Sequence, residues 1–225
     1  MTHIFLYLNL FLFLIPFALI IDKRNFTLAD VWSLFIPSLV VTVIFSETGV
    51  FLAGLKVWSF NPEYLIDITY RNIPLEMYLF YFTSSFASLA VYCYLNARFP
   101  KNDLQKYSLS LSNLLLGLMI AFLFFAYTKW YTVITFAILF LLMLFVEYKN
   151  QLRFMYRFYR AFAVCLIPFY ISFGILCNMP IINYKASETL GVNLFNIPVE
   201  NHFYMMGMLL LGVYVLEVLK SRRVK

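Results

Sequence analysis

Charged residues are scarce in this sequence. Only 12% of its 225 residues are Asp, Glu, Lys or Arg, whereas about 25% is usual for a soluble domain. Hydrophobic residues make up 63% of the chain, and its mean hydropathy is +0.82. A polypeptide of this composition cannot cover itself with polar surface, so a soluble domain is excluded and lipid is the expected solvent. Since no linker or low-complexity segment divides the sequence, residues 1–225 are predicted to form one membrane domain.

Cysteine is also sparse, and the chain lacks the spacings with which proteins hold metals. Its three cysteines, Cys93, Cys165 and Cys177, show no CxxC or histidine-rich pattern and are interpreted as small buried hydrophobic residues. The glycine-rich phosphate loop, the dinucleotide-binding fingerprint, the HExxH motif and the triad signatures are absent as well. We therefore expect neither a metal ion nor a cofactor.

The cations that are present lie mostly at the ends of apolar runs. A net charge of +6 is compatible with a nucleic-acid partner, but this placement follows the positive-inside rule instead, so no nucleic acid is expected. One set of alternating loops, together with the C-terminal tail, holds Lys23, Arg24, Arg98, Lys101, Lys106, Lys149, Arg153, Arg157, Arg160, Lys220, Arg222, Arg223 and Lys225. The opposite set holds Lys56, Arg71, Lys129 and Lys185. This asymmetry predicts a multi-pass protein of the cell membrane with its N-terminus outside and its C-terminus in the cytoplasm.

Seven apolar runs are long enough to be membrane spans, at about 20 residues per crossing. The first run is interpreted as a retained helix and not as a signal peptide, because its cations follow the apolar stretch. The sequence therefore predicts an all-α, polytopic membrane bundle of about seven transmembrane helices. The predicted spans are 3–21, 30–48, 75–95, 108–127, 130–147, 158–177 and 202–219.

A five-residue motif occurs twice, 124 residues apart, near the start of the third and seventh spans. The two copies are Asn72-Ile73-Pro74-Leu75-Glu76 and Asn196-Ile197-Pro198-Val199-Glu200. Because both spans run in the same direction, the chain is predicted to contain two three-helix repeats of parallel topology. The predicted divisions are repeat one at about 1–99, a connector helix at about 100–128 and repeat two at about 129–225.

Glu76 and Glu200 are the candidate catalytic residues. Each closely follows a proline that starts a helix, so each could simply favour the positive end of the helix dipole, an effect of about 0.3–1 kcal/mol. The repeat supports a second interpretation, because sites tend to form where related halves meet. Two carboxyls that face one apolar chamber are desolvated and repel each other, and both effects keep a carboxyl protonated and able to act as a general acid.

Aromatic residues accompany these acids. We expect Phe80, Phe203 and Tyr204 in the spans, and Trp58 in the loop before the first motif, to bind the substrate, because ring faces attract a cationic intermediate. The alternative is that these rings form an interfacial belt and pack the bundle. An apolar chamber of this kind suits a hydrophobic substrate that is dissolved in the bilayer.

At these residues the chain resembles the small integral-membrane lycopene cyclases of bacteria and archaea, which occur as paired subunits or as one fused chain with two related halves. The matching stretches are residues 57–62 before the first motif, residues 191–200, and His202-Phe203-Tyr204 after the second motif. The resemblance implies an isomerase with a carotenoid substrate: a proton adds to the terminal double bond, a ring closes through a carbocation, and a proton leaves. It also implies that Glu76 and Glu200 are the first acids of the two family motifs.

The sequence departs from the family pattern directly after each glutamate. The family usually has a second acid there, where this chain has Met77 and Asn201. The alternative to a working cyclase is therefore a homologue that binds a carotenoid or another isoprenoid for a partner enzyme of the carotenoid pathway. A small transporter is a third hypothesis, and the scarcity of polar residues within the spans argues against it.

Overall fold

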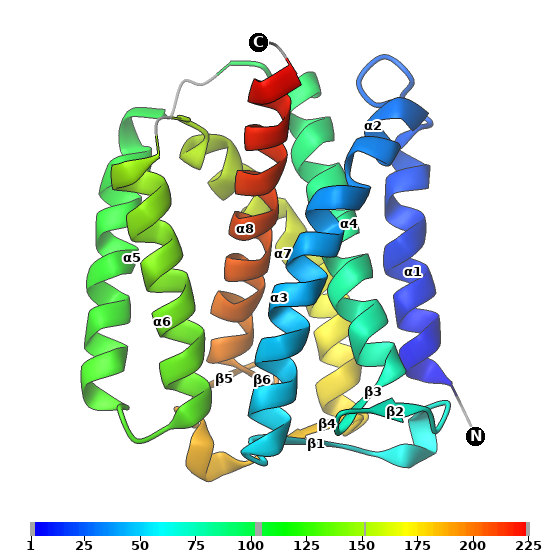
Figure 1. The fold of residues 1–225 in the computed structure, drawn as a ribbon, viewed down its shortest axis with the longest axis vertical. Helices are drawn as coiled ribbons and strands as arrows, with labels where there is room; N and C mark the ends of the chain where they lie inside the picture. Colours follow the sequence, from blue (N-terminus) through cyan, green and yellow to red (C-terminus); the bar gives the residue numbers. More distant parts are fainter. Residues whose placement is uncertain (1–2, 102–104, 151, 224–225) are drawn as a thin grey trace.

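The computed structural model describes residues 3–101, 105–150 and 152–223; Lys225, a tail cation used above to predict the orientation, lies outside them. Helices run roughly side by side, and short strands cover one end of the bundle (Figure 1). The helices are α1 (Ile4–Leu19), α2 (Leu28–Ser33), α3 (Phe35–Gly54), α4 (Leu75–Arg98), α5 (Gln105–Phe125), α6 (Trp130–Leu144), which ends in a π-turn (Phe145–Lys149), α7 (Met155–Asn178) and α8 (Val199–Arg223). The strands are β1 (Trp58–Phe60), β2 (Thr69–Tyr70), β3 (Ile73–Pro74), β4 (Ile182–Tyr184), β5 (Asn193–Leu194) and β6 (Ile197–Pro198).

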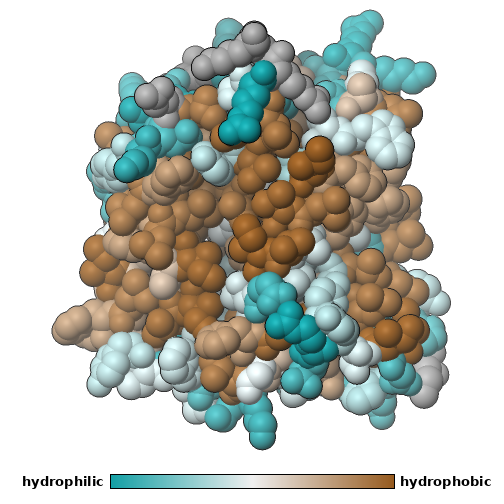
Figure 2. Space-filling model, viewed as in Figure 1, coloured by the Kyte–Doolittle hydropathy of each residue, from teal (hydrophilic) through white to brown (hydrophobic). Residues whose placement is uncertain are grey.

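Every predicted span coincides with an apolar helix. Among the described residues, six helical segments are long and apolar enough to cross a membrane, with α2 and α3 counted as one, and α1 is a shorter apolar helix of 16 residues. The N-terminal end of the chain lies with the strands at one end of the bundle, and the C-terminal end lies at the other (Figure 1). A broad apolar belt separates more polar ends (Figure 2). The chain is therefore a polytopic, all-α membrane protein, as the sequence predicts.

The second span is interrupted near its beginning. Pro37 has no N–H to continue the helical ladder, and its ring crowds the preceding turn, so α2 gives way to α3 at Leu34. The backbone N–H of Thr27 donates to Asp30 Oδ2 at 2.8 Å, and this contact fixes the start of α2. Because α3 continues to Gly54, the helix extends beyond the predicted limit of residue 48.

The sheet formed by β1 and β4 marks the axis that relates the two halves. Strands β1 and β4 pair antiparallel, and Ser59 lies opposite Asn183 at the centre of the ladder. These two residues are 124 positions apart, which is the spacing of the repeated motif. An antiparallel ladder centred on equivalent residues has a local two-fold axis through its middle. The two repeats therefore meet at this sheet.

The repeated motif folds the same way in each half. Strands β2 and β3 form a hairpin before α4, and β5 and β6 form the equivalent hairpin before α8. Asn72 and Asn196 occupy the left-handed region, with φ of 67° and 63°, a conformation that asparagine tolerates in tight turns. The proline of each motif then ends a strand, and the helix begins at the next residue. This local geometry delivers each glutamate to the start of a long helix.

Candidate functional site

Glu76 and Glu200 are the second residues of α4 and α8, and both side chains are 0% exposed. Each carboxyl accepts a hydrogen bond from a residue outside its own helix. The backbone N–H of Ile66 donates to Glu76 Oε1 at 2.6 Å, and that of Leu190 donates to Glu200 Oε1 at 2.6 Å. Oε2 of each glutamate is buried and has no hydrogen-bond partner among the described residues. Each half thus presents one anchored and one free carboxyl oxygen.

In both halves a helix packs beside the acid, but the hydrogen bond that this helix donates to the glutamate differs between the halves. On the α6 side, Thr132 Oγ1 donates to Glu200 Oε1 at 2.8 Å. On the α1 side, Asn9 Nδ2 donates to the backbone carbonyl of Glu76 at 3.0 Å and does not bond its carboxyl. The carboxyl of Glu200 therefore has one donor more than that of Glu76, and the two acids are not equivalent.

A cluster of aromatic rings lies where the halves meet. It contains Trp58, Tyr131 and Tyr204, which are buried, and Tyr184, which is half-buried. The ring of Trp58 is 5.6 Å from Tyr131, 6.2 Å from Tyr184 and 6.4 Å from Tyr204, measured between centroids. The rings of Tyr131 and Tyr184 stack at 5.5 Å. Because Trp58 and Tyr184 are partners in the β1–β4 ladder, the sheet between the repeats assembles this cluster.

Asn201, the residue directly after Glu200, ties this cluster to α8. Its Oδ1 accepts a hydrogen bond from the Tyr131 hydroxyl, and its Nδ2 donates to the Tyr184 hydroxyl at 2.8 Å. Burial raises the pKa of Tyr184, on the loop between α7 and α8, well above its usual value, so its hydroxyl stays protonated. The equivalent residue in the first half, Met77, is buried and apolar. Only the second half therefore keeps a polar group next to its acid.

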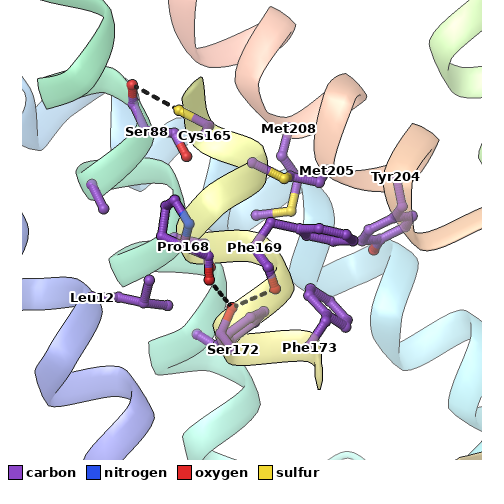
Figure 3. Close-up of a pocket in the computed structure, with 13 residues that line it drawn as sticks. Leu12, Ser88, Cys165, Pro168, Phe169, Ser172, Phe173, Tyr204, Met205 and Met208 are labelled. Atoms are coloured by element: carbon purple, nitrogen blue, oxygen red, sulfur yellow. Dashed lines mark hydrogen bonds between the residues drawn. The ribbon is translucent and has the colours of Figure 1, made fainter. Parts of the chain in front are cut away.

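A narrow cavity of about 30 Å³ lies deeper in the bundle, between α1, α4, α7 and α8 (Figure 3). Phe80 and Tyr204, each one helical turn after a motif glutamate, form part of its wall. The remaining wall is apolar or weakly polar and includes Ala87, Ser172 and Met205. A wall of this kind suits an apolar ligand.

Three of the four expected substrate-binding residues gather in this region, and one does not. Trp58 and Tyr204 belong to the aromatic cluster, and Phe80 lines the cavity and packs 5.3 Å from the ring of Phe173. Phe203 instead lies 4.7 Å from the ring of Phe136, on the side of α8 that meets α6. Adjacent residues on a helix point about 100° apart, so Phe203 and Tyr204 cannot share one face.

Sequence reasoning did not find Tyr131 and Tyr184. A usable signal existed for Tyr184, since it is the repeat equivalent of Phe60 and stands in the same strand position as that aromatic residue. Tyr131 also has an aromatic residue 124 positions earlier, Tyr7, but that ring is 62% exposed, so the repeat spacing does not place the two tyrosines in equivalent surroundings. The contact of Tyr131 with Asn201 depends on how α6 packs against α8.

A family model described as "Lycopene cyclase" matches the chain over residues 2–95 and 128–219, which together are well over half of its length. Each segment contains one copy of the repeated motif, and the stretch between them contains α5. No curated protein and no solved structure matches the chain.

Proposed function

Because the chain belongs to the lycopene cyclase family, we propose that it is an isomerase that closes a ring at the end group of a linear carotenoid within the membrane. One observation carries this proposal: two fully buried carboxyls stand at equivalent positions of the two repeats, each with one free oxygen. An ionisable group is placed at this depth mainly for function, since a buried acid without a task destabilises the fold.

The reaction requires an acid and a base but no net change in electrons. A protonated carboxyl of Glu76 or Glu200 donates its proton to the terminal double bond, and a carbocation forms at the adjacent carbon. A neighbouring double bond of the chain attacks this carbon and closes the ring. Loss of a proton from the ring to a carboxylate then restores a double bond, so product and substrate are isomers.

The aromatic cluster stabilises the positive charge between these steps. The faces of Trp58, Tyr131 and Tyr204 carry negative quadrupole potential, and a carbocation near them is attracted without being captured as a covalent adduct. A carboxylate alone is a less suitable stabiliser, because it can form a covalent bond with the cation. The predicted role of Phe80 is to align the apolar chain on the cavity side.

The decisive experiment is expression of the chain in a host that accumulates lycopene, followed by pigment analysis. We expect cyclic products from the unmodified chain and a loss of about 10²–10⁴-fold in conversion for Glu76→Gln or Glu200→Gln, the usual contribution of a general acid or base. Glu217→Gln is the matched control. Glu217 is also on α8, but it accepts a hydrogen bond from Tyr92 at 2.8 Å, far along the helix from Glu200. Full conversion by both test variants would refute the mechanism.

A carotenoid-binding role without catalysis is the second candidate. The observation that favours it is the buried, apolar Met77 next to Glu76, where the family usually has a second acid. In that case the purified chain retains lycopene and releases no cyclic product, and it serves a partner enzyme of the carotenoid pathway. The pigment analysis separates the two candidates, since turnover by the isolated chain excludes pure binding.

A further inference from the structure

The cavity lies where α7 meets α4 and α8, and the repeat relates this place to the one where α3 meets α8 and α4. The side chains at the equivalent positions, however, differ in size. The α4 residues that line the cavity are smaller than most of their equivalents on α8, which lie 124 residues later. Ser84, Ala87 and Ser88 correspond in this way to Met208, Leu211 and Gly212.

On the α3 side, side chains fill the space between α3, α4 and α8. The backbone of Gly49 is so close to Tyr81 that an added Cβ would lie 2.4 Å from the tyrosine Oη. The ring of Phe45 packs edge-on against Tyr204 at 5.0 Å, and the backbone carbonyl of Phe45 accepts a hydrogen bond from the Tyr204 hydroxyl at 3.3 Å. A Cβ at Gly212 would meet side-chain atoms of α3 and α4 at 3.2–3.3 Å. Helix α3 therefore lies tightly against α4 and α8.

On the α7 side the equivalent positions line the cavity. Phe169 and Phe173 are the repeat equivalents of Phe45 and Gly49, and both border the open space (Figure 3). The equivalent of Tyr81 is Met205, a flexible side chain that also lines the cavity. A methionine can change rotamer at little cost and so admit a ligand larger than the space of about 30 Å³. The pseudo-symmetry of the fold is thus broken at the place where a substrate would enter.

We propose that a linear isoprenoid chain reaches the acids through the crevice between α4, α7 and α8, and that the equivalent path beside α3 is closed. The proposal rests on the function proposed above. A protein with one open path accepts one end group in each binding event. A carotenoid with two end groups must then be released and rebound before its second ring can form.

Two neighbouring substitutions on α7 test the path. Ser172 is 2% exposed and lines the crevice, and its hydroxyl bonds only carbonyls of its own helix, so its loss leaves no distant partner unpaired. Ile171 is 46% exposed on the outside of the same helix. We expect Ser172→Phe to lower both retained lycopene and conversion by about a hundredfold, because a misplaced substrate loses its alignment. We expect Ile171→Phe to stay within about twofold, as exposed substitutions do.

A second variant guards against simple misfolding of the first. Ala87→Leu gives α4 the residue that α8 has at the equivalent position, and it should also block the crevice. Each variant is compared at equal yield of monodisperse protein in detergent. Unchanged lycopene retention and conversion in both Ser172→Phe and Ala87→Leu would overturn the proposal.

The order of product formation is an independent test. With excess lycopene, a single path predicts that free monocyclic product appears first and that bicyclic product follows after a lag. Bicyclic product formed from the start, without free monocyclic product, would contradict it. If the unmodified chain retains lycopene but forms no ring, the cyclase proposal fails, and pigment retention by the same variants still decides the path. If it neither retains nor converts lycopene, both proposals fail.

Discussion

Two glutamates in equivalent positions have different hydrogen-bond partners, and the difference traces to one residue. Thr132 on α6 donates to the Glu200 carboxyl, whereas Asn9 on α1 donates to the backbone carbonyl of Glu76 and not to its carboxyl. Among the described residues, Glu76 Oε1 is therefore bound by the Ile66 backbone N–H alone. The two repeats have thus diverged at the group that most directly controls the orientation of each carboxyl. We infer that Glu76 and Glu200 perform different steps.

Replacing Thr132 by valine tests this difference. Thr132→Val keeps the side-chain shape and removes the hydroxyl, so Glu200 loses a bond that is worth about 1.5–3 kcal/mol when the acceptor is charged. We expect conversion of lycopene to fall by about tenfold or more, in line with that energy. Thr135→Val is the control, because Thr135 is one turn away and its buried hydroxyl has no partner among the described residues. Equal rates for the two variants would show that the Thr132 bond plays no part.

Asn201 offers a second test at the scale of single residues. An aspartate there would restore the family's second acid, and it can accept hydrogen bonds from both Tyr131 and Tyr184 once the Tyr184 hydroxyl turns to donate. We therefore expect Asn201→Asp to retain or increase cyclisation. Asn201→Leu leaves two buried hydroxyls unpaired and should lower the free energy of unfolding by about 1–3 kcal/mol for each. Thermal unfolding in detergent and pigment analysis measure the two effects, and loss of activity in Asn201→Asp would contradict the first.

At the scale of helices, the contact between α3 and α4 depends on a glycine. We expect Gly49→Ala to destabilise the protein by about 1–3 kcal/mol, because its Cβ overlaps Tyr81 Oη and a packed interior resists overfilling. Adding Tyr81→Phe removes that oxygen and should recover part of the loss. Gly54→Ala serves as the control, since an added Cβ there meets nothing within 4 Å. The midpoint of thermal unfolding measures the stability of each variant. Additive effects of Gly49→Ala and Tyr81→Phe would argue against the contact.

The start of α6 is tied to the loop that binds Glu200. The backbone N–H of Trp130, the first residue of α6, donates to Glu188 Oε2 at 3.3 Å, and Lys129 Nζ donates to the carbonyl of Thr189. These contacts fix the loop directly before Leu190, whose N–H binds the Glu200 carboxyl. The helix that supplies Thr132 and the loop that supplies Leu190 are therefore positioned together.

Glu188 makes this connection sensitive to pH. The backbone N–H of Trp130, and then the ammonium of Lys185, hold the pKa of Glu188 below its usual value. A carboxyl whose pKa is lower in the folded than in the unfolded protein stabilises the folded state at pH values above the unfolded pKa. That stabilisation is lost as the pH falls through the folded-state pKa. We expect the midpoint of thermal unfolding to be higher for the unmodified chain than for Glu188→Gln at pH 7. The gap should close as the pH falls through the lowered pKa of Glu188 in the folded chain, below which the side chains of both proteins are neutral. A gap that does not change with pH would exclude this role.

At the scale of the whole molecule, the sequence was sufficient to predict the spans because apolar runs of membrane length admit few other structures. The predicted end of the second span, at residue 48, was wrong. Helix α3 continues to Gly54, and Glu47 pairs with Arg71 at 2.6 Å on the exposed end of the bundle. A charge near a helix end therefore did not mark the end of the helix.

The composition of the candidate site was less predictable, because it depends on contacts between repeats. The repeated motif placed Glu76 and Glu200 at equivalent helix starts, but the hairpins that precede these helices were not among the predictions made from the sequence. No local pattern showed that β1 pairs with β4, and this pairing brings Tyr184 to Trp58. The side of α8 on which Phe203 lies was equally invisible without the packing of α6.

The orientation of the molecule in the membrane follows from which end carries free positive charge. The end with the strands has four cations, and three of them interact with neighbouring groups. Arg71 pairs with Glu47, Lys185 pairs with Glu188, and Lys129 donates a hydrogen bond to a backbone carbonyl. The opposite end carries most of the lysines and arginines. Since the rule counts cations near helix ends, the asymmetry predicts that the strands and the acids lie near the outer surface and the C-terminus lies in the cytoplasm.

Reporter fusions measure this orientation directly. A fluorescent protein that matures only in the cytoplasm should be bright when it is fused after residue 225, and alkaline phosphatase, which needs the outer compartment, should be inactive there. Cysteine substitution provides the matched pair within the chain, because the three native cysteines are buried or half-buried. Asn183→Cys, on the strand end, should react with an impermeant maleimide added to intact cells, whereas Arg222→Cys should react only after the membrane is opened. The reverse pattern would place both glutamates near the cytoplasmic surface, and the proton for cyclisation would then come from that side.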